Sequence, residues 1–216
     1  MTTLPKNSLY KLQDQVLKYL AQANLQADFY LTGGTCLARC YFHHRVSEDL
    51  DFFCHEMASF PIKTQAIINS LRTEFDLEPL KVSPQYAAVK IDHLLKVDFV
   101  ADVGTHQGLI DSHPLFPAID NLDNILANKI SALVSRDEPK DIVDIWIISQ
   151  HHPIEWLKVF TDVGSKAAGI IPPMIAQRLE SFPSDWITQI QWEIEPPKPE
   201  IFHQDLVNLA NQIINA

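Results

Sequence analysis

The spacing of hydrophobic positions in the first hundred residues predicts short strands that alternate with helices. Apolar residues recur at helical spacing from Ser8 to about Asn24, which predicts a first helix. Strand-like runs follow at 28–32, 49–54, 86–91 and 94–99, and helical patterns lie at 35–42 and 60–75. The last two strands are joined tightly at Asp92-His93, as in a hairpin. Together these elements predict a mixed sheet flanked by helices.

Beyond about Pro117 the pattern of apolar residues becomes helical. Helices are predicted at 121–135 and 139–149 and in the segments that contain Trp156, Ile175 and Leu206. The expected fold class is therefore α+β. We expect a mixed-sheet core over residues 1–116 and a helical C-terminal region over residues 117–216.

The composition is that of an ordinary globular protein. Of the 216 residues, 46% are hydrophobic, 9% aromatic and 20% charged, which excludes a disordered or collagen-like chain. No apolar run approaches the ~18 residues that a membrane span needs, and the N-terminal residues lack the apolar stretch of a secretory signal peptide. The 3 cysteines are an odd number, which favours reduced thiols. We therefore expect a cytoplasmic protein with no membrane partner.

The net charge limits the nucleic-acid chemistry that the chain can perform. Lysine and arginine number 17 against 27 acidic residues, which gives a formal net charge of -10. Such a chain repels phosphate backbones, so broad, non-specific binding of nucleic acid is disfavoured. A site that holds one nucleotide through Mg²⁺ remains compatible, because a divalent ion requires acidic ligands and reverses the local charge.

Two aspartates on one predicted strand are the first candidates for such chemistry. Asp49 and Asp51 are two residues apart, so a strand places both carboxylates on the same face. Two carboxylates this close repel each other unless a cation lies between them, and Mg²⁺ prefers hard carboxylate oxygens. The alternative is an exposed, acidic strand end without a ligand.

The residues around this pair strengthen the case for a phosphate site. Gly33, Gly34 and Thr35 lie at a predicted strand-to-helix junction, where backbone N–H groups and the helix dipole favour an anion. The alternative role of Thr35 is helix capping alone. A third acid, Asp98, alternates with apolar residues on a later strand. If that strand neighbours the first, three carboxylates converge on one cleft.

The helical region also places charged residues at unusual positions. Lys129 falls within an apolar stripe, so its ammonium either reaches the surface or approaches a phosphate at a cleft. Lys140, Asp141 and Asp144 share one face of the next helix, and the alternative to a functional role is a structural ion-pair cluster. Arg136 is able to bind phosphate or to pair with a nearby acid.

Taken together, these motifs resemble the AbiEii/AbiGii toxin family of nucleotidyltransferases, which belongs to the DNA polymerase β-like superfamily. The resemblance is carried by segments in a fixed order: GGT at 33–35, RVSEDLDFF at 45–53, KVDF at 96–99, ANKI at 127–130 and RDEPKDIVDI at 136–145. Several ordered motifs are far more specific than any single one. The resemblance implies a polymerase β-like nucleotidyltransferase core, with the helical region completing the cleft.

The resemblance also implies a reaction and assigns roles to residues. Asp49, Asp51 and Asp98 are expected to be catalytic and to hold one or two Mg²⁺ ions. The expected nucleotide-binding residues are Gly33, Gly34, Thr35, Arg45, Ser47, Lys129, Lys140, Asp141 and Asp144. The reaction would transfer NMP from an NTP to an RNA (tRNA) or protein acceptor, in the toxin of a toxin–antitoxin or phage-defence pair. The alternative is an inactive relative that acts as a protein or nucleic-acid interaction module.

Overall fold

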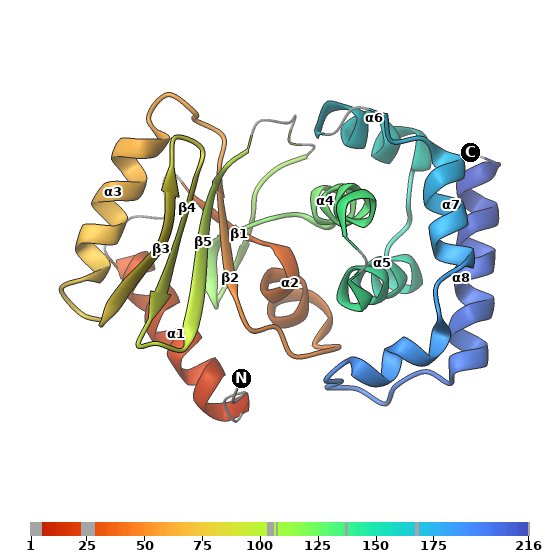
Figure 1. Ribbon diagram of the computed structural model, residues 1–216, viewed down its shortest axis with the longest axis horizontal. Coiled ribbons are helices and arrows are strands. Elements are labelled where there is room, and N and C mark those ends of the chain that lie inside the picture. The colour runs from red at the N-terminus through yellow and green to blue at the C-terminus, as the bar shows by residue number, and fades with distance from the viewer. Residues whose placement is uncertain are drawn as a thin grey trace. The chain divides into compact units, whose positions relative to one another are not determined.

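The computed structural model describes residues 6–22, 29–102, 106, 108–136, 138–166 and 169–215. Within it the chain divides into two compact units (Figure 1). We call the first the sheet unit; it comprises Met1–Cys40, Ser47–Val103 and Leu109–Asp120. We call the second the helical unit; it comprises Tyr41–Val46, Gly104–Gly108 and Asn121–Ala216. The predicted division into functional domains at residue 117 stays a prediction.

A mixed sheet organises the sheet unit. In the part of the chain that the structure describes, the sheet has seven strands: β1 (Tyr30–Thr32), β2 (Leu50–Cys54), β3 (Leu77–Ser83), β4 (Tyr86–Ile91), β5 (Leu95–Ala101), β6 (Asp111–His113) and β7 (Phe116–Ile119). Their order is β3-β4-β5-β2-β1-β7-β6. The pairs β2·β5 and β1·β7 are parallel, and the other neighbouring pairs are antiparallel. This mixed sheet with helices confirms the expected fold class.

Helices cover the sheet, and its central strands carry the core. The helices of this unit are α1 (Lys6–Gln22), α2 (Gly33–Cys36) and α3 (Phe60–Leu71), and α2 continues into a π-helical segment, η2 (Leu37–Phe42). Phe52 and Phe99 stack with ring centroids 5.6 Å apart, and Phe116 meets Phe52 edge-on at 5.5 Å. All three rings are buried, and strand alternation turns Phe52 and Phe99 away from Asp51 and Asp98 of the same strands.

Three strands lie outside the predicted set. Strand β3 is exposed along most of its length, so it lacks the alternation of buried and exposed residues that marks a strand in sequence. Strands β6 and β7 are short, and Pro117 interrupts the usual strand signal. The helix predicted at 35–42 begins earlier, at Gly33. Residues 23–28, where the first helix and the first strand were expected to end and begin, lie outside the described residues.

The helical unit is built from α4 (Leu122–Ser135), α5 (Pro139–His151), α6 (Trp156–Lys166), α7 (Pro172–Glu180), the 3₁₀ segment η3 (Ser184–Gln189) and α8 (Pro199–Ile214). Helices α4 and α5 confirm the two predicted helices. Helices α7 and α8 lie side by side (Figure 1). Trp146 joins their core, with its ring 5.3 Å from Phe202 and 6.2 Å from Trp192. No helix within the described residues is long and apolar enough to span a membrane.

The packing of Phe52 leads to a stability prediction. Replacing Phe52 with Ala removes a fully buried ring between Phe99 and Phe116, and we expect the free energy of unfolding to fall by about 3–5 kcal/mol. Ile62→Ala is the control, because Ile62 is 76% exposed on α3. Urea unfolding followed by circular dichroism measures both. A Phe52 variant as stable as the control would contradict this account of the core.

Candidate functional site

The sheet brings two of the predicted carboxylates side by side. Asp51 on β2 pairs directly with Asp98 on β5, and the two strands are parallel. Residues in register on parallel strands point to the same face, so these carboxylates are neighbours. Asp49 lies just before the start of β2, and its charge acts on Lys96, the partner of Asp98. Strands β2 and β5 are therefore neighbours, which the sequence analysis could only assume.

Two further side chains hold Asp98. The hydroxyl of Tyr86 donates to one oxygen of Asp98 at 3.0 Å, and the ammonium of Lys96 lies 2.5 Å from the other. Partial burial would lower the pKa of Lys96, but the charges of Asp98 and Asp49 raise it overall. Burial and the hydrogen bond to Asp98 raise the pKa of Tyr86. Lys96 thus supplies positive charge to the space between the carboxylates.

The glycine-threonine segment lies against the same residues. Gly33 has a φ of 68°, and a Cβ at this position would collide with the Asp51 carboxylate. A glycine is therefore required on both conformational and steric grounds. The hydroxyl of Thr35 donates a hydrogen bond to the backbone carbonyl of Asp49. These contacts fix the start of α2 against the beginning of β2.

The chemistry of these residues fits a divalent metal. Asp49, Asp51 and Asp98 offer the carboxylate oxygens that Mg²⁺ prefers. As the side chains stand, no three His, Cys, Asp or Glu residues of the described ranges are grouped to hold a metal ion, and Asp98 is paired with Lys96. The arrangement suits Mg²⁺, which commonly uses one or two carboxylates and completes its shell with waters and phosphate oxygens.

A second group of predicted residues forms a buried charge cluster inside the helical unit. Its centre is Asp144, which is fully buried on α5. Arg45 binds Asp144 with two hydrogen bonds, from Nε at 2.7 Å and from Nη2 at 2.6 Å. His44 Nε2 lies 2.9 Å from the same carboxylate. Burial alone would raise the pKa of Asp144, but Arg45 and Lys129 hold it well below its usual value.

Lys129 belongs to this cluster. Its ammonium lies 2.6 Å from Asp144 and 2.8 Å from Asp141, and only 9% of its side chain is exposed. Burial would lower the pKa of Lys129, but the two carboxylates raise it. Arg136 also pairs with Asp141, at 2.7 Å. Lys129 therefore does not extend to the surface. Arg136 was expected either to bind phosphate or to pair with a nearby acid, and in the structure it pairs with Asp141.

The predicted residues therefore occupy different places. The sheet unit gathers Gly33, Thr35, Asp49, Asp51 and Asp98, with Gly34 in the same helix, α2. The helical unit gathers Arg45, Lys129, Asp141 and Asp144. Ser47 is buried in the sheet unit, where its carbonyl accepts a hydrogen bond from Gln13 at 2.9 Å. Lys140 is exposed on α5.

Sequence reasoning missed four residues around these groups. The two-residue spacing does predict that Lys96 shares a face with Asp98, and only its ion pair with Asp98 was missed. Tyr86 and His44 reach their partners only through strand pairing and loop folding, which the sequence does not reveal. Asp120 is fully buried and accepts a 2.5 Å hydrogen bond from Thr32, which pairs with Asp51 across β1 and β2. The polar segment at 43–48 buries both His44 and Arg45.

Comparison with known families identifies the chain. The family model described as "Nucleotidyl transferase AbiEii toxin, Type IV TA system" matches residues 15–194, which is most of the chain. The chain belongs to this family. The resemblance seen in the sequence motifs is thereby confirmed, and the AbiEii-family chain is a nucleotidyltransferase. A search of curated proteins finds no match to it.

Solved structures share the fold at low sequence identity. JHP933 from Helicobacter pylori is 17% identical, with 99% of this chain and 94% of that chain covered and a TM-score of 0.65. A putative nucleotidyltransferase from H. pylori is 16% identical, with 98% and 96% covered and a TM-score of 0.67. The nucleotidyltransferase toxin MenT4 from Mycobacterium tuberculosis is 13% identical, with 98% and 84% covered and a TM-score of 0.62. At these identities the comparison shows that the AbiEii-family chain shares the fold of these proteins.

The ion pairs of Lys129 predict the effect of removing its charge. Lys129→Met keeps the length of the side chain but leaves two buried carboxylates with less positive charge. We expect the free energy of unfolding to fall by about 3–5 kcal/mol. Urea unfolding measures the loss, and Lys158→Met on exposed α6 is the matched control, since exposed ion pairs contribute little. An unchanged Lys129→Met variant would contradict the structural role of this cluster.

The lowered pKa of Asp144 predicts a pH dependence. Asp144 ionises more readily in the folded than in the unfolded chain, so its contribution to stability is complete above the unfolded pKa, near 4. As the pH falls below about 4, this contribution declines and disappears below the folded pKa. Urea midpoints of wild type and Asp144→Asn, measured from pH 7 downward, should differ by a constant amount and then converge. If the difference between the two urea midpoints stays constant at all acid pH values, the lowered pKa of Asp144 is refuted.

Proposed function

We propose that the protein transfers NMP from an NTP to a macromolecular acceptor in a reaction that depends on Mg²⁺ and releases pyrophosphate. The observation that carries this proposal is the in-register pairing of Asp51 with Asp98, with Gly33 against Asp51 and Asp49 directly before the strand. Adjacent carboxylates next to a glycine-rich helix start suit a metal-bound triphosphate. Membership of a nucleotidyltransferase toxin family supports the same reaction.

The carboxylates have separate roles in this proposal. Asp49 and Asp51 hold one or two Mg²⁺ ions. When bound, Mg²⁺ neutralises phosphate charge and polarises the phosphoryl group that is attacked. Asp98 contributes to the second metal position and accepts the proton from the acceptor hydroxyl. The hydrogen bonds from Tyr86 and Lys96 orient the Asp98 carboxylate for that role.

The nucleotide-binding residues fall into two classes in the proposal. Gly33, Gly34 and Thr35 present backbone N–H groups to the triphosphate. Lys140 is exposed on α5, and in this proposal its ammonium approaches the phosphates. The remaining residues expected to bind nucleotide act by maintaining local structure, because most of their charge is used in ion pairs or backbone contacts: Arg45, Ser47, Lys129, Asp141 and Asp144.

The proposed biological role is that of a toxin whose activity is counteracted by an antitoxin. The family description names a toxin of a type IV toxin–antitoxin system. Transfer of NMP to tRNA or to a protein in the cytoplasm, where NTPs are abundant, would inactivate the acceptor. The competing hypothesis is an inactive relative that acts as an interaction module. The protein is incubated with each labelled NTP, Mg²⁺ and either total RNA or total protein. Labelling of an acceptor distinguishes an active transferase from an inactive interaction module.

Asp51→Asn is the direct test of the metal-dependent site. The change removes one negative charge while preserving shape, and we expect transfer to fall at least a hundred-fold, which is on the order of the loss seen when a key electrostatic contact is removed. Asp76→Asn is the matched control, because Asp76 is a 70% exposed aspartate of the same unit. Labelled-NMP incorporation measures both variants, and thermal melts verify that each is folded. Full turnover by Asp51→Asn would place the metal elsewhere.

If the wild-type protein transfers no label with any NTP to either acceptor pool, the interaction-module hypothesis gains support. That result would leave the fold and the family membership unchanged. It would remove the reaction assigned to Asp49, Asp51 and Asp98.

A further inference from the structure

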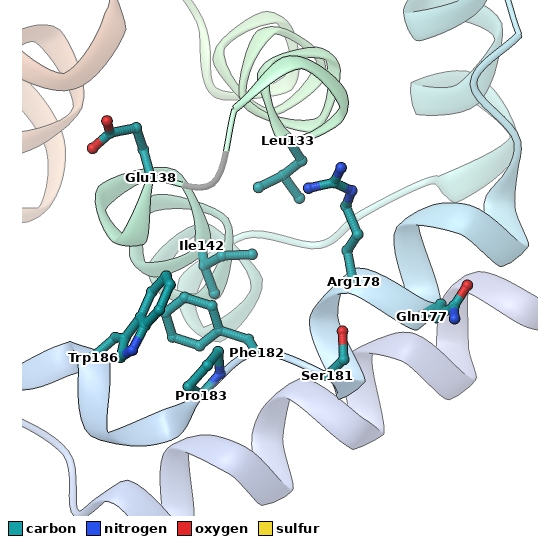
Figure 2. Close-up of a pocket in the computed structure, with 9 residues that line it drawn as sticks. All are labelled: Leu133, Glu138, Ile142, Gln177, Arg178, Ser181, Phe182, Pro183 and Trp186. Atoms are coloured by element: carbon teal, nitrogen blue, oxygen red, sulfur yellow. The ribbon is translucent and has the colours of Figure 1, made fainter.

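The helical unit contains a cavity that the proposed reaction does not use. Its volume is about 410 Å³, which lies within the usual range for small-molecule sites, roughly 300–1,000 Å³. Helices α4, α5 and α7 and the segment around η3 form its walls (Figure 2). Leu133 and Ile142 are buried and form an apolar base. The cavity is therefore built by elements that are each fixed in the core of the unit.

An aromatic wall forms one side of the cavity. Trp186 and Phe182 meet edge to face, with ring centroids 5.9 Å apart and planes at 81°. Phe182 in turn contacts Phe202 of α8 at 6.1 Å. The backbone of Trp186 is held by a 2.9 Å hydrogen bond to Pro183. Trp186 is nevertheless 38% exposed, so a large ring is held rigidly with part of its surface available to a ligand.

Polar groups occupy the opposite side. Figure 2 shows Arg178 extending from α7 toward Leu133, with Gln177 and Ser181 on the same helix side. Glu138 also lines the cavity, but its carboxylate is directed away from Arg178 (Figure 2). Arg178 is the cation among the lining residues. The cavity therefore combines a flat aromatic surface, an apolar base, hydrogen-bonding side chains, one arginine and one glutamate.

We propose that this cavity is a second nucleotide-binding site, separate from the carboxylates of the sheet unit. The base lies against Trp186, since every base offers a π-face to an aromatic ring. The phosphate pairs with Arg178, whose planar guanidinium suits phosphate oxygens. Gln177 and Ser181 offer hydrogen bonds to the edge of the base or to the sugar.

The charges limit the ligand to a single nucleotide or the end of a strand. The cavity supplies one arginine, whereas tracking a long backbone requires a series of cations. The chain as a whole carries a net charge of -10, which opposes a longer phosphate backbone. The ligand is thus a free nucleotide or the terminal nucleotide of an RNA acceptor. In the second case the inference rests on the proposed transfer to RNA.

The test measures binding without turnover, so that it does not depend on catalysis. The full-length Asp51→Asn protein is titrated by calorimetry with each nucleoside monophosphate in EDTA, where metal-dependent binding is absent. Trp186→Ala should weaken binding about ten-fold or more, and Trp186→Phe, which keeps a π-surface, should restore most of it. Rescue by Phe separates stacking from a general loss of structure.

Arg178 provides an independent signature. Arg178→Gln should weaken binding of the monophosphate about ten-fold while leaving binding of the matching nucleoside unchanged, because only the phosphate contact is lost. Lys158→Gln, which removes an exposed cation from α6 of the same unit, is the matched control and should change neither. Thermal melts of all variants establish that they are folded.

A single-stranded RNA pentamer distinguishes the two sources of the ligand. Tighter binding of the pentamer than of the monophosphate indicates an RNA end, and equal binding indicates a free nucleotide; both outcomes support the site. The proposal is wrong if no nucleotide binds in EDTA, or if Trp186→Ala and Arg178→Gln bind nucleotide as the parent does. Loss of transfer in Asp51→Asn with nucleotide binding retained leaves both proposals standing.

Discussion

The parallel pairing of β2 with β5 is the constraint on which the candidate site depends. It places Asp51 opposite Asp98, and the alternation of side chains then puts Phe52 and Phe99 together in the core on the other face. The same backbone hydrogen bonds therefore fix both the acidic site and the hydrophobic packing behind it. A slip of one residue would bury the carboxylates and expose the phenylalanines, so the site and the core cannot be altered independently.

The second organising interaction is the charge cluster around Asp144. Burying an acid is unfavourable unless cations and hydrogen bonds surround it, and Arg45, Lys129 and His44 provide them. Arg45 comes from a loop, whereas Lys129 and Asp144 come from α4 and α5. The ion pairs of this cluster therefore connect segments of the helical unit that are distant in sequence. Its residues resemble ligand-binding residues in sequence because both roles require charge at otherwise apolar positions.

The sequence predicted the central strands, the main helices and the carboxylates of the sheet, because periodicity and local spacing are properties of single segments. It could not locate β3, which is mostly exposed, or the short β6 and β7. It also could not decide the partners of Lys129, since an ammonium on an apolar stripe is compatible with solvent, phosphate or carboxylate until the neighbouring helix is placed. Asp120 and Tyr86 acquire their partners only through tertiary pairing.

The path of the chain between the two units has a consequence for genetic dissection. Residues Tyr41–Val46 belong to the helical unit, although the segments on either side belong to the sheet unit. The side chains of His44 and Arg45 in this segment bind Asp144, about a hundred positions later in the chain. A gene fragment that ends after β7 would thus encode Arg45 and His44 without the carboxylate that both side chains bind. The segments of the two units alternate along the sequence, so no single truncation of the gene encodes either unit completely.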